Sequence, residues 1–200
     1  MRLFATLTLL VVPMTLIAEE KKEPTKEAGP LELKVILKTD TIVWDADEKA
    51  RKEFKTTLED AQKKMLKKPP ENVKLPALPV FEATLQITNT SKKEVTMQVE
   101  GDANKLTLDL KGPGVIALSP LRAFTANFNL GRAVTLKSGE KFEIPIQKLG
   151  DGFRRASRDI YWTDLGEYTL TASYIIGGGD GEKESVLTSE PVKFKVSDKK

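Results

Sequence analysis

Apolar and polar side chains alternate most regularly between residues 166 and 174. The apolar positions are Tyr168, Leu170, Ala172 and Tyr174, and the polar positions between them are Thr169, Thr171 and Ser173. A period of two residues is typical of a strand with one buried face. Similar alternation recurs in about eight short segments separated by turn residues, which predicts a mainly β chain.

The other strand predictions follow the same pattern. They cover residues 31–38, 81–87, 95–99, 106–110, 115–118, 133–136, 142–146 and 192–196. We expect residues 41–44 to continue the first strand and 95–99 to form the hairpin partner of 81–87. Pro145 predicts an edge strand or a bulge. Residues 119–132 are less regular, with Phe124 and Phe128 as expected core anchors, and residues 150–162 read as a long connection.

One segment has helical periodicity, from residue 46 to residue 67. Its apolar positions recur three or four residues apart, at Ala50, Phe54, Leu58, Ala61 and Met65. Asp45 or Asp47 can cap its first turn, and Pro69-Pro70 ends it. We expect the stripe to cover an open end or edge of the β domain. The alternative is a helix that binds a partner.

The turn Asp164-Leu165-Gly166 before Tyr168 resembles the entry to strand F of immunoglobulin-like sandwiches. In that fold a tyrosine hydroxyl ties the corner to the backbone, which gives Asp164, Gly166 and Tyr168 a structural role. Leu170 stands where antibody domains have a cysteine. The predicted fold is therefore mainly β, an immunoglobulin-like or fibronectin-III-like antiparallel sandwich with one inserted helix at about 46–67.

The N-terminus has the layout of a secretory signal: one positive charge, an apolar run and a small residue at Ala18. The alternative is a membrane anchor, but residues 3–18 are short for a span of about 20 residues and contain Pro13. We expect a signal peptide at 1–18, a flexible charged leader at 19–30 and one domain at 31–197. The expected location is the periplasm or the exterior, that is, the cell envelope.

The chain has no histidine and no cysteine. This excludes Ser-His-Asp and Cys-His catalysis, histidine or thiolate metal sites, disulfides and a lipidated N-terminal cysteine. The net charge is only +3, from 32 basic and 29 acidic residues, which argues against a nucleic-acid binder. We expect no catalytic residue, no metal and no cofactor.

The best candidate for binding is the aromatic and basic run within 150–162. Its residues are Phe153, Arg154, Arg155, Arg158 and Trp162. Arginine and aromatic residues are enriched at binding hot spots, and binding residues concentrate on loops. The alternative is that Phe153 and Trp162 fill the bottom of the core while the arginines are solvated.

Four weaker motifs have plain structural interpretations. Asn89-Thr90-Ser91 matches a glycosylation sequon but is interpreted as a turn. Residues 179–182 have only a faint likeness to a calcium loop. Trp44 can stack on a sugar ring or pack under the helix. The acidic pairs Glu59-Asp60 and Asp45/Asp47 are interpreted as solvated charge.

Three segments, 87–91, 108–114 and 162–170, together resemble uncharacterised secreted immunoglobulin-like sandwich proteins of planctomycete-type bacteria, over most of residues 31–197. The chain also resembles the bacterial proteinase-inhibitor-like sandwich domain, in its Asn-x-Ser turn and its Gly-x-Tyr-x-Leu strand. The first resemblance implies an exported sandwich without an assigned activity, and the second implies an exposed inhibitory loop.

The function expected from the sequence is that of a non-catalytic binding or structural module of the cell envelope. Its partner would be another envelope or extracellular protein, or else a glycan, with no nucleic acid and no transmembrane segment after signal cleavage. Two alternatives remain open. One is proteinase inhibition through an exposed loop, and the other is carbohydrate binding or hydrolysis by a pair of carboxylates.

Overall fold

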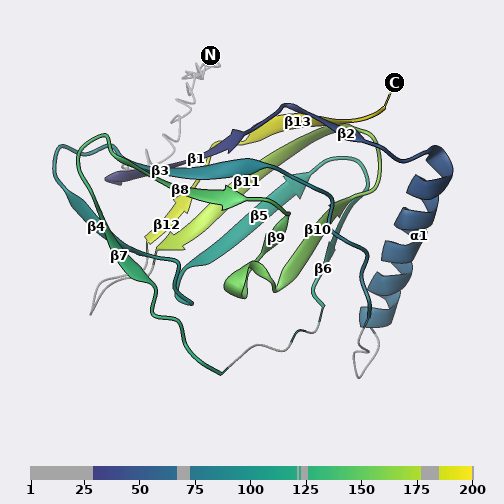
Figure 1. The fold of residues 1–200 in the computed structure, drawn as a ribbon, viewed down its shortest axis with the longest axis horizontal. Helices are drawn as coiled ribbons and strands as arrows, with labels where there is room; N and C mark the ends of the chain where they lie inside the picture. The colour runs from purple at the N-terminus through teal and green to yellow at the C-terminus, as the bar shows by residue number, and fades with distance from the viewer. Residues whose placement is uncertain (1–28, 67–72, 121, 123–125, 177–184, 200) are drawn as a thin grey trace, which may run out of the picture.

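The computed structural model describes residues 29–66, 73–120, 122, 126–176 and 185–199, and Figure 1 shows their arrangement. The chain forms an immunoglobulin-like β-sandwich with one inserted helix, as the alternation predicts. The strands are β1 (Leu31–Leu37), β2 (Thr41–Trp44), β3 (Ala83–Asn89), β4 (Val95–Val99), β5 (Lys105–Lys111), β6 (Val115–Leu118), β7 (Arg132–Leu136), β8 (Lys141–Ile146), β9 (Gly150–Asp151), β10 (Arg158–Trp162), β11 (Gly166–Ile176), β12 (Ser185–Thr188) and β13 (Val192–Asp198). The helices are α1 (Glu48–Met65) and the single 3-10 turn η1 (Phe153–Arg155).

The sandwich has two main layers. One is the antiparallel sheet β1-β3-β8, in which β8 is an edge strand, as Pro145 predicts. The other is built around β11, which pairs with β5 on one side and with β13 and then β12 on the other. Alternate residues of both layers meet in one hydrophobic core, including Leu85 and Ile87 of β3 and Leu108 and Leu170 of the opposite layer.

The corner before β11 has the expected tyrosine contact. The hydroxyl oxygen of Tyr168 lies 2.5 Å from the carbonyl oxygen of Asp164 and 2.5 Å from that of Pro113, so its single proton is shared between the two acceptors. Gly112 lies directly against the ring, because a Cβ at this position would come within 2.3 Å of Tyr168 Cδ1. The corner therefore joins the β5–β6 turn to the start of β11.

Two strand pairings differ from the sequence prediction. Residues 41–44 do not continue the first strand, because the chain turns at Thr39–Asp40 and β2 joins the other layer, parallel to β13. Residues 95–99 do not pair with β3, because β3 already has β1 and β8 as neighbours, and β4 pairs with β7 instead.

Asn89 explains the second difference. Its side chain is fully buried and donates to the carbonyl oxygens of Lys93 and Leu136, at 2.7 and 2.8 Å, and its Oδ1 accepts from Ser91. These bonds fix a bend at which the β3–β8 ribbon passes into the β4–β7 ribbon. The sequon prediction of a turn is confirmed, and both amide hydrogens of Asn89 are used within the fold.

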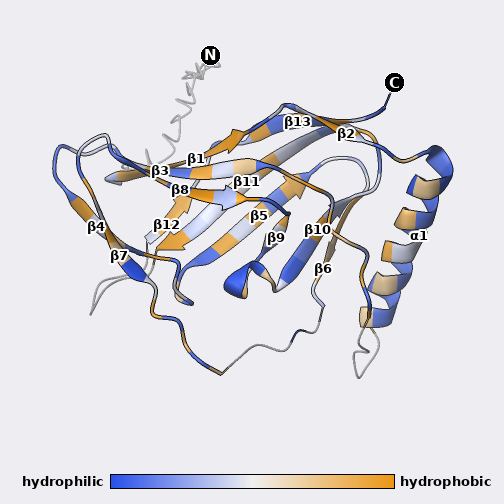
Figure 2. Ribbon diagram, in the orientation of Figure 1, coloured by the Kyte–Doolittle hydropathy of each residue, from blue (hydrophilic) through white to orange (hydrophobic). Residues whose placement is uncertain are grey.

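The helix adds a third layer beside the small sheet β6-β10-β9 (Figure 1). Figure 2 shows that apolar positions recur along α1 between charged ones. Leu58 and Ala61 pack with Leu118 of β6 and Tyr161 of β10 in a second hydrophobic cluster, separate from the main core. The prediction that the helix covers the β domain is confirmed, with Asp47 as its N-cap and with Ala50 exposed.

The two phenylalanines expected to anchor the core have different outcomes. Phe128 is 64% exposed and does not anchor the core, because residues 126–130 run along the surface. Phe124 lies outside the described residues. Among the residues that the structure describes, none of the helices combines the length and apolar composition needed to cross a membrane.

Candidate functional site

Trp162 is a core residue, so the prediction that it belongs to the binding surface was wrong. It ends β10, is 1% exposed, and its ring lies 6.0 Å from that of Phe194 and 6.3 Å from that of Tyr168. Its neighbour Tyr161 points to the opposite face of β10 and donates its hydroxyl to Pro76 O at 3.1 Å. Both faces of β10 are buried, so its sequence does not alternate between apolar and polar residues. For this reason the sequence predicted residues 158–162 as part of a connection and not as a strand.

Arg154 is held by Asp102, a side chain that is 3% exposed. Its Nε donates to Oδ1 at 2.9 Å and its Nη2 to Oδ2 at 2.7 Å, a bidentate pair. Hydrogen bonds from Arg154 and from the backbone of Asn129 hold the pKa of the Asp102 carboxyl below its ordinary value. The pair ties η1 to the turn before β5.

Arg158 is held in the same way by Asp151, which is also 3% exposed at its side chain. Arg158 Nε donates to Oδ1 at 3.0 Å, and the backbone N–H of Leu108 donates to Oδ2 at 2.7 Å. The carbonyl of Leu108 accepts from Arg158 Nη2 at 2.7 Å. Two of the three arginines predicted to contact a partner therefore serve to fix the loop.

The loop between these pairs has an unusual backbone. Arg154 and Arg155 have φ of 51° and 53°, in the left-handed region that costs an L-residue about 1–2 kcal/mol. Gly152, at φ 82°, precedes them, and a Cβ there would come within 2.6 Å of Ser157 Cβ. The strain is retained because the surrounding ion pairs over-determine the conformation.

The rigid loop presents Phe153 and Arg155 at the surface. Phe153 is 38% exposed, and the Arg154 guanidinium lies 5.1 Å from its ring centroid. Arg155 donates from Nη1 to Pro145 O at 3.2 Å, and within the described ranges it has no carboxylate partner. Arg155 is thus the exposed cation of the predicted set that has no carboxylate at ion-pair distance in the described residues, although its charge acts on Glu100.

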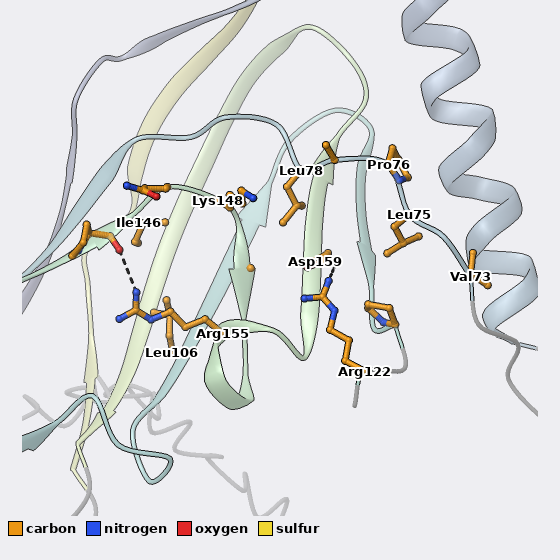
Figure 3. A pocket seen from close by; sticks show the side chains of 15 residues that line it. Val73, Leu75, Pro76, Leu78, Leu106, Arg122, Ile146, Lys148, Arg155 and Asp159 are labelled. Carbon is orange, nitrogen blue, oxygen red and sulfur yellow. Dashed lines mark hydrogen bonds and ion pairs between the residues drawn. The ribbon is translucent and has the colours of Figure 1, made fainter. Parts of the chain in front are cut away.

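Arg155 lies between two hollows. The first is a groove of about 700 Å³ between the 73–78 connector, the 145–150 segment and β10. Figure 3 shows Leu75 and Leu78 on one side, Arg155 and Ile146 on the other, and Lys148 and Asp159 between them. Asp159 is buried and pairs with Arg122, as the dashed line marks, and desolvation raises the pKa of its carboxyl.

The second hollow, of about 600 Å³, lies on the other side of the loop. Its lining is mostly polar and includes Glu100, Asp102, Asn129, Arg154 and Phe128. Arginine contacts hold the pKa of Glu100 and Asp102 below their ordinary values. A carboxyl that acts as a general acid needs a raised pKa instead, so this pair does not have the electrostatics of a glycosidase site.

The other sequence candidates have structural partners. Trp44 packs edge-on against Phe54 of α1 with ring centroids 5.6 Å apart, which favours the packing interpretation. Asp45 pairs with Lys199 and Asp60 with Lys63. Residues 179–182 lie outside the described part, and in the part that is described no three His, Cys, Asp or Glu side chains gather as a metal site would require.

Sequence reasoning missed Lys148 and Asp159, and it placed Phe128 in the core although this residue lines the second hollow. No local motif joins Lys148 to Leu75 or to Arg155, because only the fold brings these segments together. Asp159 did carry a signal: it is a charged residue directly before the apolar Ile160-Tyr161-Trp162. A carboxylate at the end of a buried strand is rare unless it is paired.

No family model matches the sequence, and no curated protein sequence matches it. Three solved structures show weak likeness. A fragment of alpha-2-macroglobulin from Escherichia coli has 17% identity and a TM-score of 0.29 over 61% of this chain and 17% of its own. A β-glucosidase from Erythrobacter marinus has 9% identity and a TM-score of 0.26, over 80% of this chain and 15% of its own. A FixG-related protein from Vibrio parahaemolyticus has 12% identity and a TM-score of 0.27, over 84% of this chain and 98% of its own. At such TM-scores the likenesses carry no argument about this chain.

Proposed function

We propose that the protein is a non-catalytic binding module of the cell envelope that holds a partner protein through the loop around Arg155. The observation that carries this proposal is the rigid presentation of Phe153 and Arg155 between two arginine–aspartate pairs. A binding surface gains affinity when its contact residues are fixed before the partner arrives, because less entropy is lost on association. Arginine next to an aromatic ring is also the composition typical of hot spots.

The surroundings of the loop support a protein partner. Phe128 and Leu130 are strongly exposed apolar side chains, and Phe128 lines the second hollow together with Arg154 and Arg155. Large exposed apolar residues that gather near a polar rim are typical of interaction surfaces. Export to the envelope is part of the same proposal and rests on the signal-like residues 1–18. The resemblance of the sequence to secreted planctomycete-type sandwich proteins supports the same proposal of export.

The alternatives have less support. A proteinase inhibitor needs an extended, protruding loop, whereas residues 153–155 form a compact turn. A carboxylate hydrolase needs two suitably spaced carboxyls in one cleft, and Asp159 is the single carboxylate among the residues that line the larger groove. A glycan is the alternative ligand of the same surface.

The test uses the full-length chain with a C-terminal affinity tag, produced in its source organism. Fractionation locates the protein, and cross-linking followed by purification identifies its neighbours, whose affinity is then measured with purified components. We expect an envelope location and one specific partner, with affinity reduced at least about tenfold in Phe153→Ser/Arg155→Gln. The matched control is Val186→Ser/Lys193→Gln, which alters an exposed apolar residue and an exposed lysine on β12 and β13.

A cytoplasmic location would contradict the envelope assignment. A partner that binds both double variants equally well would contradict the loop assignment. Thermal unfolding of both variants shows whether each retains the fold, so a loss of affinity through unfolding is recognised.

A further inference from the structure

The larger groove has one apolar wall that is unusually well fixed. Leu75 and Leu78 belong to an extended connector that contains Pro76 and Pro79. Proline restricts the backbone, and the buried Tyr161 hydroxyl anchors the connector by its bond to Pro76 O. Leu75 and Leu78 of this connector also pack against the second hydrophobic cluster. The wall is therefore preformed and not a loop that must order around a ligand.

The facing side of the groove is cationic. In the described part of the chain Lys148 has no carboxylate at ion-pair distance, although its charge acts on Asp159. Arg155 donates to the Pro145 carbonyl, and its charge acts on Glu100 on the other side of the loop. Arg122 differs, because its charge is compensated by Asp159 at the floor. Both residues line the same hollow, and Figure 3 shows that Lys148 reaches it from the 145–150 segment and Arg155 from η1, with the Arg155 guanidinium turned toward the Pro145 carbonyl. The groove lining carries the basic side chains Arg122, Lys148 and Arg155 against the single acidic side chain Asp159. This net positive charge next to an apolar wall suits an anion with an apolar neighbour.

We propose that this groove binds an extended segment of a partner protein that carries an acidic side chain beside an apolar one. Lys148 and Arg155 hold the carboxylate, and Leu75 and Leu78 hold the apolar side chain. The inference deepens the proposed function and rests on it, since it specifies the chemistry of the partner. A groove of about 700 Å³ has the size of an ordinary ligand site.

The charge pattern selects this ligand over a polyanion. A nucleic-acid strand would carry a charge at every nucleotide, and its next phosphates would meet the buried Asp159 and the apolar connector. A peptide places charged and apolar side chains close together on an extended backbone, which matches a cationic side and an apolar side across one groove. The carboxylate that fits is therefore an isolated one.

The experiment is a titration of the full-length chain, followed by NMR, with two peptides that differ only in charge. The probes are acetyl-Leu-Ser-Leu-Glu-Leu-amide and acetyl-Leu-Ser-Leu-Gln-Leu-amide. We expect the glutamate peptide to bind at least about tenfold more tightly, because hydrogen bonds to charged groups are the stronger kind. Binding should weaken as salt rises from about 0.05 M to about 0.5 M, because screening shortens the range of the charges.

Single substitutions in the groove test where the peptide binds. Lys148→Gln and Arg155→Gln should each weaken binding of the glutamate peptide severalfold and leave the glutamine peptide unchanged. The control Lys141→Gln removes an exposed lysine from β8, outside the groove lining, and should leave both peptides unchanged. Equal affinity for the two peptides, or no binding of the glutamate peptide at about 1 mM, would overturn the inference.

Lys148 also separates this inference from the proposed function. It lines the groove and not the second hollow. If the cellular partner is lost with Phe153→Ser/Arg155→Gln but retained by Lys148→Gln, the loop binds a partner and the groove inference fails alone. If the peptide site is present and no cellular partner depends on the loop, the proposed function fails instead.

Discussion

The hydroxyl of Tyr168 lies 2.5 Å from the carbonyl oxygen of Asp164, four residues earlier in the chain. The same hydroxyl reaches Pro113 O, so a single phenol joins two turns at one end of the sandwich. Its ring stacks on Phe194 with centroids 5.4 Å apart. The corner therefore combines core packing with a hydroxyl that two half-buried carbonyl groups share.

Tyr168→Phe should destabilise the fold by about 0.5–1.5 kcal/mol, because it removes the hydroxyl that both carbonyls share while the ring stays in place. Urea unfolding followed by fluorescence measures the loss. A change below about 0.5 kcal/mol would mean that water replaces the hydroxyl and that the corner is not a structural element.

Alkaline pH should unfold the protein through Tyr161 and Tyr168. Burial raises the pKa of each phenol from 10.0 to about 12. The unfolded chain ionises first, so the stability that these neutral phenols supply is fully present below pH 10 and is lost as pH rises through 12. Unfolding free energies across this window should fall less steeply in Tyr161→Phe/Tyr168→Phe than in the parent. If the unfolding free energies of the variant and the parent fell equally steeply with pH, the raised pKa values of Tyr161 and Tyr168 would not explain the alkaline unfolding.

Asp151→Ala should be strongly destabilising, by about 3 kcal/mol, because it leaves Arg158 without its partner. It also removes the acceptor of the buried Leu108 N–H. Glu32→Ala is the control, since Glu32 is an exposed carboxylate on β1 whose contact is a surface pair with Lys34. Equal midpoints in chemical denaturation for the two variants would show that the Asp151 pair does not fix the loop.

Arg155→Gly should be more stable than Arg155→Ala by about 1 kcal/mol, because glycine adopts the left-handed backbone without strain. Both variants remove the guanidinium, so both should lose the partner. Thermal denaturation compares the stabilities and a binding titration compares the affinities. If alanine proved the more stable of the two, the left-handed assignment at 155 would be wrong.

Asp159→Asn should stabilise the protein at neutral pH. Desolvation raises the pKa of this carboxyl above 3.8, against the opposing effect of Arg122. The contribution of the carboxyl to stability is largest when it is protonated and decreases as pH rises through its pKa in the fold. The advantage of the asparagine variant should therefore shrink as pH is lowered below 3.8. A variant less stable than the parent at neutral pH would show that the pair with Arg122 outweighs desolvation.

The alternating strands were predictable because each has one buried face. Leu85 and Ile87 on β3, and Tyr168 and Leu170 on β11, are buried as their spacing requires, and so is Phe81 just before β3. Local chemistry also predicted the Tyr168 corner and a helix cap at Asp45 or Asp47, of which the structure uses Asp47. Such features depend on residues only a few positions apart.

The candidate site was predictable only in part, because its chemistry comes from distant segments. Arg155 stood out within an aromatic and basic run, but nothing near Trp162 distinguishes a surface tryptophan from a core one. The sequence of β10 does not alternate between apolar and polar residues, because α1 covers the outer face of this strand. Arg154 and Arg158 looked solvated until Asp102 and Asp151 were placed beside them by the fold.

The separation of the two hydrophobic clusters gives the molecule two levels of local stability. Undocking α1 exposes Leu58, Ala61 and their partners but leaves the main core between the sheets closed. Units that open independently exchange their amide hydrogens at their own, lower free-energy cost. The helix and the connector on which Leu75 lies share the smaller cluster. We therefore expect the apolar wall of the groove to exchange its amide hydrogens together with the helix, and the cationic side to exchange with the sandwich.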